Sequence, residues 1–186
     1  MRKGLTEVVF ILDRSGSMAS LVEDTVGGFN AMINKQKKLD GKCFVSTVLF
    51  DNESSVLHDR LPLEDVKPMT EEDYAVGGCT ALRDALGGAI HHIENIHRYA
   101  RPEDVPDKTI FIITTDGYEN ASKKYTADQV KKEVAKKSEE GWEFIYLAAN
   151  IDAVSSAEAI GIRGERAVNF RQTAKGMRAS FGAINE

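Results

Sequence analysis

Hydrophobic and polar positions along the chain follow two alternating patterns. Short apolar runs rich in β-branched residues are typical of buried strands, and apolar residues spaced three and four apart line one face of a helix. The first pattern predicts strands at 7–12, 44–50, 54–58, 108–115, 143–148 and 167–170. The second predicts helices over about 21–39, 80–99, 126–140 and 155–160, with a terminal helix from Thr173 onward. This alternation predicts an α/β sandwich around a mostly parallel sheet.

The connections between these elements refine the sheet. Asp51-Asn52 is a short link, so strands 44–50 and 54–58 should form a hairpin with the later strand antiparallel. The stretch 60–73 is broken by Pro62 and Pro68 and is predicted to be loop with a single helical turn. The chain shows no linker or internal repeat, so residues 1–186 are predicted to form a single domain.

Polar side chains gather where the two most apolar strands end. Strand 7–12 is followed at once by an Asp-x-Ser-x-Ser segment, strand 108–115 runs into Thr-Asp-Gly, and a Gly-Gly-Cys-Thr segment opens helix 80–99. Ligands bind at the carboxyl ends of parallel strands, so these segments should converge if the two strands are neighbours. Their oxygen-bearing side chains are Asp13, Ser15, Ser17, Thr80 and Asp116.

Two carboxylates and three hydroxyls form a ligand set of hard oxygens. Such a set suits Mg²⁺, or alternatively Mn²⁺ or Ca²⁺, better than zinc. The carboxylates of Asp13 and Asp116 only just neutralise a divalent ion, which leaves a place for an outside ligand such as an Asp or Glu of a partner protein. Each segment alone also has an ordinary explanation, as a helix cap or a turn. The prediction of a metal site rests on all three occurring in a consistent order.

These segments resemble the von Willebrand factor type A (VWA) family, and the resemblance spans nearly the whole chain. That family's metal ion-dependent adhesion site (MIDAS) consists of Asp-x-Ser-x-Ser after the first strand, a Thr in a Gly-rich loop and the Asp of a Thr-Asp-Gly segment, and all five positions are present here. The stretches 13–18 (DRSGSM) and 77–86 (GGCTALRDAL) are similar to the intracellular bacterial branch. The resemblance implies a Rossmann-like three-layer sandwich with helices on both faces of a six-stranded sheet, one edge strand being antiparallel.

The resemblance also implies roles for the five positions. Ser15 and Ser17 would bind the ion directly, and Asp13 and Asp116 partly through water. Thr80 would correspond to the member that, in some relatives, exchanges direct for water-mediated binding when the partner's carboxylate arrives. Two departures from the family pattern, Cys79 and the residues 118–120 after Gly117, leave the ligands in place but change the rim that a partner touches.

Further residues are predicted to support the site or form its rim. Asp84 lies one helical turn after Thr80 and is expected to hydrogen-bond a ligand hydroxyl. Gly78 and Gly117 belong to the two ligand loops. Asn150 follows strand 143–148, where it either joins the rim or turns the chain into the next helix.

Composition narrows the possible partners and the location. The net charge of −5 argues against a nucleic-acid binder. The apolar run from Val8 to Leu12 is too short for a signal peptide or a membrane span, so no membrane insertion is expected and a cytoplasmic location is predicted by default. Two cysteines, Cys43 and Cys79, do not suggest a disulfide framework.

The main alternative is a Mg²⁺-dependent hydrolase or phosphoryl-transfer enzyme on a similar fold. Such enzymes also place an Asp after a central strand, but they need a second carboxylate and an activating Lys beside it, where this chain has Ser15 and Ser17. The phosphate-binding motif G-x-x-x-x-G-K-[ST] is absent. A domain that binds no metal at this site is the third possibility. The sequence therefore favours a metal-dependent protein-binding module that is not an enzyme.

Overall fold

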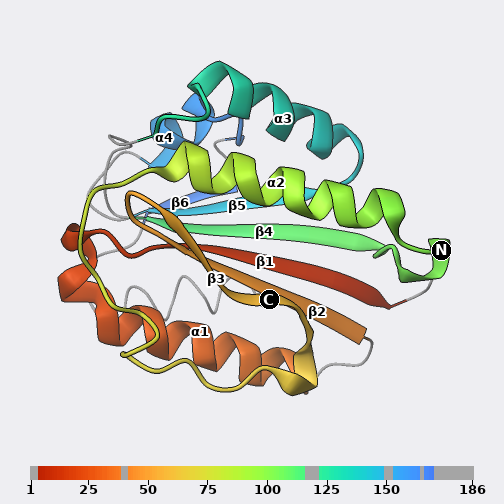
Figure 1. Cartoon of the computed structure of the whole chain (residues 1–186), viewed down its shortest axis with the longest axis horizontal. Helices are drawn as coiled ribbons and strands as arrows, with labels where there is room; N and C mark the ends of the chain where they lie inside the picture. The colour runs from red at the N-terminus through yellow and green to blue at the C-terminus, as the bar shows by residue number, and fades with distance from the viewer. Residues whose placement is uncertain (1–3, 39–41, 116–121, 149–152, 164–165, 170–186) are drawn as a thin grey trace.

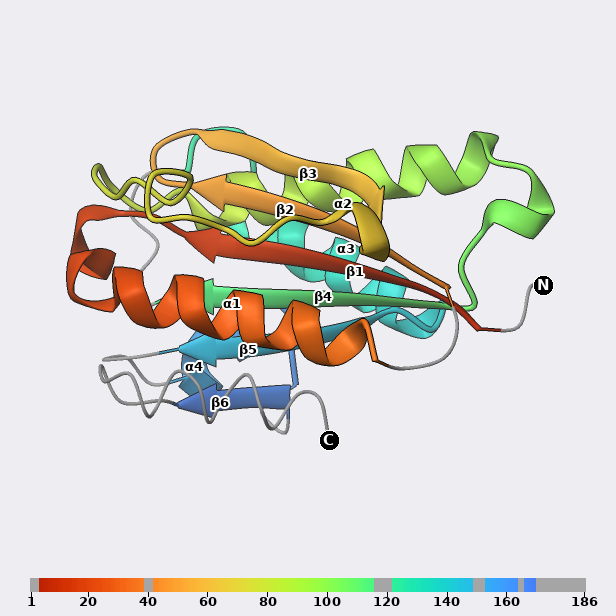
Figure 2. The same ribbon diagram turned by 90° about the horizontal axis from the view of Figure 1, so that it is seen from below.

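The fold is a mixed sheet covered by helices on both faces (Figure 1). The computed structural model describes residues 4–38, 42–115, 122–148, 153–163 and 166–169. Six strands pair in the order β3-β2-β1-β4-β5-β6. Their bounds are β1 Leu5–Asp13, β2 Lys42–Phe50, β3 Ser54–Pro62, β4 Lys108–Thr115, β5 Glu143–Ala148 and β6 Ala167–Asn169. β3 runs antiparallel to β2, and the other neighbours are parallel (Figure 2).

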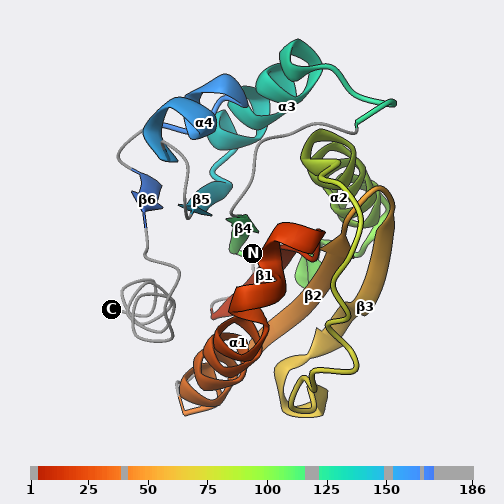
Figure 3. The same ribbon diagram turned by 90° about the vertical axis from the view of Figure 1, so that its left-hand side faces the viewer.

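Helices cover the two faces of this sheet unequally. α1 (Val22–Gln36) lies on one face, whereas α2 (Leu82–Tyr99), α3 (Ala127–Glu139) and α4 (Ala153–Ala159) lie on the other (Figure 3). Short 3-10 turns are η1 (Gly16–Leu21), η2 (Leu63–Asp65) and η3 (Pro102–Asp104). A capping box opens α3, with Thr126 accepting from the Gln129 N–H and the Gln129 side chain accepting from the Thr126 N–H.

Alternating residues of the buried strands supply two hydrophobic cores. On the α1 face Phe10 packs against Phe29 in an edge-to-face pair, with ring centroids 4.9 Å apart. On the opposite face Ile11 and Ile113 pack with Leu86 and Ile90 of α2. β1 and β4 are adjacent and in parallel register, with Leu12 opposite Thr114. Their carboxyl ends therefore meet at one edge of the sheet, as the sequence predicts.

The expected α/β class with its mixed sheet is confirmed, and most element boundaries agree to within a few residues. The extent of β3 is a correction, since it continues to Pro62 where loop was expected from residue 60. Its pairing with β2 is irregular around Thr47, and Arg60 takes a positive φ of 50° at this irregularity. The terminal helix predicted from Thr173 lies outside the described residues.

The contacts of Arg60 stabilise this irregularity in the pairing of β2 and β3. Its Nε donates to both carboxylate oxygens of Glu7, at 2.7 and 3.0 Å, and its guanidinium lies over the ring of Phe44. The Nε2 of His97, in the last turn of α2, lies 3.2 Å from a carboxylate oxygen of Glu7. The Glu7 side chain is fully buried, so these contacts compensate a charge that would otherwise be costly inside the fold.

Replacing Glu7 should therefore destabilise the fold strongly. Glu7→Gln leaves the Arg60 guanidinium without its carboxylate, and we expect the free energy of unfolding to fall by about 3 kcal/mol in urea denaturation. Glu143→Gln is the matched control. It removes a carboxylate whose ion pairs with Lys108 and Arg166 are more exposed, and it should cost less than about 1 kcal/mol. Equal losses in the two variants would contradict this account of Glu7.

Candidate metal centre

Asp13 is the last residue of β1, and its carboxylate is fully buried. Its Oδ2 accepts a hydrogen bond of 2.7 Å from the hydroxyl of Thr115, the last residue of β4. Its Oδ1 accepts from the backbone N–H of Ser15, also at 2.7 Å. The hydroxyl of Tyr74 donates to the Asp13 carbonyl oxygen. These bonds fix the carboxylate where the two central strands end.

Ser15 stands at the start of the 3-10 turn η1, but its side chain does not cap that turn. The N–H of Met18 donates to the Ser15 carbonyl oxygen instead, at 2.9 Å. Ser15 is 2% exposed, so its hydroxyl is held inside the site rather than in solvent. The ordinary explanation of this segment as a side-chain N-cap therefore does not hold for Ser15.

The Gly-rich loop before α2 is bound directly to this segment. The N–H of Gly16 donates to the carbonyl oxygen of Gly78 at 3.0 Å, and the N–H of Gly77 donates to that of Arg14 at 2.8 Å. Thr80 follows this loop and is 4% exposed. The two ligand loops thus approach each other through backbone bonds that do not depend on a bound ion.

The connection between β2 and β3 forms the outer support of the Gly-rich loop. The Oδ1 of Asn52 accepts from the N–H of Cys79 at 2.7 Å, and the carbonyl oxygen of Asp51 accepts from the N–H of Ala81 at 2.8 Å. Gly78 has a φ of +85°, and a Cβ there would lie 2.6 Å from the Asn52 oxygen. Only glycine fits at this position, which gives Gly78 a structural role beside Thr80.

Asp84, on the first turn of α2, binds the segment that follows the Thr-Asp-Gly residues. Its carboxylate accepts from the backbone N–H groups of Lys123, Lys124 and Tyr125, at 2.8 to 2.9 Å. Burial alone would raise the pKa of Asp84, but these N–H donors and the charge of Lys124 lower it below its ordinary value. The described contacts of Asp84 are thus to this backbone, whereas a ligand hydroxyl was expected from the sequence.

The structure brings together the predicted residues that it describes. Asp13, Ser15 and Thr80 lie at one end of the sheet, with Thr115 leading directly into Asp116. The side chain of Ser17, and the residues Asp116, Gly117 and Asn150, lie outside the described part.

Sequence reasoning missed two side chains of this site. Thr115 was foreseeable, because it ends a strand that neighbours the one ended by Asp13. No sequence signal points to Tyr74, which comes from an irregular segment.

The donors present fit a small hard cation. The buried carboxylate of Asp13 is held in place by two hydrogen-bond donors, and the buried hydroxyls of Ser15 and Thr80 supply neutral oxygens. Among the residues that the structure describes, no three His, Cys, Asp or Glu side chains gather as a metal site. The described part of the candidate centre thus offers one carboxylate, that of Asp13, and the hydroxyls of Ser15 and Thr80.

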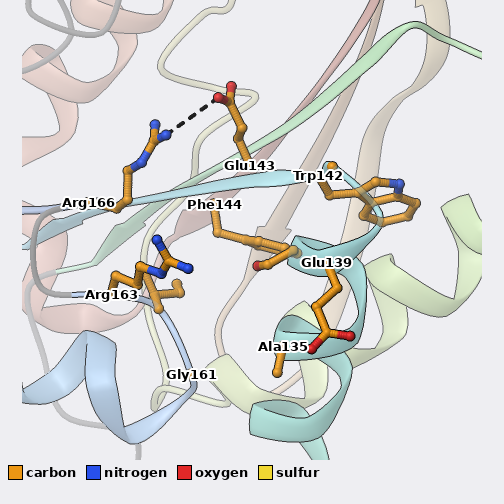
Figure 4. A pocket seen from close by; sticks show the side chains of 11 residues that line it. Ala135, Glu139, Trp142, Glu143, Phe144, Gly161, Arg163 and Arg166 are labelled. Atoms are coloured by element: carbon orange, nitrogen blue, oxygen red, sulfur yellow. Dashed lines mark hydrogen bonds and ion pairs between the residues drawn. The ribbon is translucent and has the colours of Figure 1, made fainter.

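A separate hollow of about 480 Å³ lies between the end of α3, the start of β5 and the chain leading into β6 (Figure 4). Glu143 and Arg166 face each other there, 3.5 Å apart, and Lys108 lies 3.2 Å from the other Glu143 oxygen. One carboxylate thus pairs with two cationic side chains there. The hollow adjoins the amino end of β5, whereas Asp13 lies at the carboxyl end of β1.

No protein-family model matches the chain, and none of the curated proteins matches it. Solved structures do match. The pilus adhesin SpaC from Lactobacillus rhamnosus GG has a TM-score of 0.75 at 11% identity, over 100% of this chain and 30% of the adhesin. A von Willebrand factor type A protein from Catenulispora acidiphila has a TM-score of 0.68 at 14% identity, over 98% and 42% of the two chains.

Proximal thread matrix protein 1 from the mussel byssus, in a structure described as having a zinc-occupied MIDAS motif, has a TM-score of 0.65 at 16% identity. That match covers 98% of this chain and 45% of the mussel protein. The chain spans less than half the length of these first matches. At such identities the likeness concerns architecture, and the chain has the von Willebrand factor type A fold. None of the described helices is both long and apolar enough to cross a membrane.

The hydrogen bond from Thr115 to Asp13 gives a direct test of how the site is organised. Thr115→Val removes the donor at Asp13 Oδ2 without changing the size of the side chain greatly. We expect affinity for Mg²⁺ or Mn²⁺, measured by titration calorimetry, to fall about tenfold. Thr109→Val, a buried threonine near the other end of β4, is the control and should leave the affinity unchanged. Equal affinity in wild type and Thr115→Val would show that Asp13 needs no such donor.

Proposed function

We propose that this chain is a protein-binding module that uses one divalent metal ion, preferably Mg²⁺, to hold an Asp or Glu of its partner. The observation that carries the proposal is that the Asp-x-Ser-x-Ser segment, the Gly-rich loop and the end of β4 meet around the buried carboxylate of Asp13. That carboxylate is bonded to Thr115 and to the N–H of Ser15, and the loop of Ser15 is bonded to the loop of Thr80. Asp116 comes next after Thr115 in the chain.

In this proposal the five predicted residues have two different roles toward the ion. Ser15, Ser17 and Thr80 offer neutral hydroxyl oxygens, and Asp13 and Asp116 balance the charge of the ion. The ion itself supplies a positive centre to which an outside carboxylate binds. Two carboxylates on a divalent ion leave little net charge, so a third, from a partner, is accommodated without strong repulsion. Hard oxygen donors favour Mg²⁺ over zinc.

The comparisons support this proposal at the level of the fold. The mussel protein's structure is described with an occupied MIDAS motif, and SpaC is described as a pilus adhesin. Neither description names the ion or the partner of this chain. The inference from fold to metal-dependent binding of a partner therefore rests on the five predicted ligand residues of this sequence.

We place the module in the intracellular bacterial branch of VWA proteins and in the cytoplasm. Support comes from the stretches 13–18 and 77–86 and from the cysteines, since Cys43 and Cys79 are both free thiols. Free thiols are typical of a reducing compartment.

Metal titration of ligand variants tests this function. Wild-type protein should bind Mg²⁺ or Mn²⁺ saturably in calorimetry, and Ser15→Ala, Thr80→Ala and Asp116→Ala should each weaken binding at least about tenfold, because each removes a ligand oxygen. Ser138→Ala, at an exposed serine of α3, is the matched control and should bind as wild type does.

A pull-down in Mg²⁺ and in chelator then connects the metal to a partner. We expect bound proteins to be released by chelator and to be absent from the Ser15→Ala eluate. Saturable metal binding that survives all three substitutions would place the ion elsewhere. Hydrolysis of a phosphate ester that Asp13→Asn abolishes would favour the enzyme alternative instead.

A further inference from the structure

A polar hollow of about 890 Å³ adjoins the candidate metal centre. One wall is the β2–β3 connection, the other is the chain leading into α3, and the start of α2 lies between them (Figure 3). Cys79, the residue before Thr80, lines it, so the hollow begins beside a predicted metal ligand. Its lining residues are Asn52, Glu53, Ser54, Cys79, Asp84, Gly88, Lys123, Lys124 and Tyr125.

The wall formed by residues 122–125 is firmly held on α2. The carboxylate of Asp84 takes three of its backbone N–H groups, and the N–H of Asp84 donates to the Ser122 hydroxyl at 3.1 Å. The ring of Tyr125 lies against Gly87 so closely that a Cβ there would meet it at 2.7 Å. This segment is therefore anchored mainly by its backbone and its aromatic ring, and the charge of Lys124 adds an attraction to Asp84.

The opposite wall is held just as directly. Asn52 bonds the N–H of Cys79 through its side chain, and the N–H of Glu53 donates to Asp51 Oδ1 at 3.0 Å. The thiol of Cys79 is exposed between the two walls. Two fixed walls beside a metal centre form a preorganised surface, which lowers the entropic cost of binding an extended segment.

Lys123 and Lys124 give this hollow its chemical character. Both are exposed, and within the described part of the chain neither forms an ion pair with a carboxylate. Of the two carboxylates that line the hollow, Asp84 accepts from backbone N–H groups and is attracted by the charge of Lys124, and Glu53 lies on the opposite wall. These two ammonium groups lie next to the candidate metal centre, which is proposed to bind a carboxylate. Together they favour a ligand with more than one acidic group.

We infer that this hollow receives an acidic segment of the partner protein, in which one Asp or Glu binds the metal and a second acidic residue pairs with Lys123 and Lys124. This inference rests on the proposed function and adds a specificity determinant to it. The metal binds any accessible carboxylate. The lysine pair selects segments that carry a second acidic residue at a suitable distance from the first. Rim charges of this kind act on specificity and association rate more than on total affinity.

The probes for this inference are synthetic peptides in which one Asp is followed, across glycine spacers of increasing length, by either Glu or Gln. Binding to the full chain in Mg²⁺ is measured as protection of Cys79 from maleimide. Cys43 is the internal reference, because burial, together with the charges of Glu7 and Glu64, raises the pKa of its thiol to about 11 and keeps it protonated.

For at least one spacer, the Asp/Glu peptide should protect Cys79 at about fivefold lower concentration than its Asp/Gln counterpart. In Lys123→Glu/Lys124→Glu this difference should vanish, with metal affinity and protection by the Asp/Gln peptide unchanged. Lys132→Glu/Lys136→Glu, on the exposed face of α3, makes the same change in net charge and should keep the difference.

The outcomes separate this inference from the proposed function. The inference is overturned if both peptides protect Cys79 equally at every spacer, or if the difference between them is lost in both double variants. In either case, metal-dependent protection by the Asp/Gln peptide still supports the proposed function. Absence of metal-dependent protection by any peptide overturns both. Protection by inorganic tripolyphosphate without protection by peptides also overturns the inference, and indicates a phosphate ligand.

Discussion

The buried carboxylate of Asp13 is the constraint on which the arrangement of this site depends. A charge with no exposure to solvent is tolerated only if donors or a cation surround it. Thr115 at the end of β4 supplies one donor, and the backbone of Ser15, in the loop that follows β1, supplies the other. Satisfying one carboxylate therefore aligns the segments that carry the other proposed ligands.

Hydrogen bonds attach the surrounding loops to the Asp13 segment and to one another. Backbone bonds from Gly16 and Gly77 attach the Gly-rich loop to the Asp-x-Ser-x-Ser segment, and Asn52 supports that loop from outside. Asp84 then ties the chain that follows Asp116 to α2. The candidate metal centre and the hollow beside it consequently share one framework, in which Asp84 and Asn52 accept hydrogen bonds from backbone N–H groups. The Glu7–Arg60 pair lies toward the amino ends of the strands and serves the stability of the sheet.

Much of this organisation could be predicted from the sequence. The apolar runs of β1 and β4 are unambiguous, and the polar segments after them, with the Gly-rich loop before α2, predict that Asp13, Ser15 and Thr80 lie at one end of the sheet. What could not be predicted depends on contacts between distant residues. The continuation of β3 to Pro62 requires the pairing of Arg60 with Glu7, and the contact of Tyr74 with Asp13 joins residues 61 positions apart. For Asp84, helical spacing gave the correct face, but its partners belong to another loop.

The most direct test of a metal-centred account is a crystal structure with Mn²⁺, located by its anomalous scattering. The account predicts one peak at the carboxyl ends of β1 and β4, about 2.1 Å from hydroxyl oxygens of the Asp-x-Ser-x-Ser segment. It also predicts that Asp13 keeps its bonds to Thr115 and Ser15 when the ion is bound. A peak at another place, or none at a Mn²⁺ concentration that saturates calorimetric binding, would contradict the claim that this carboxylate organises a metal centre.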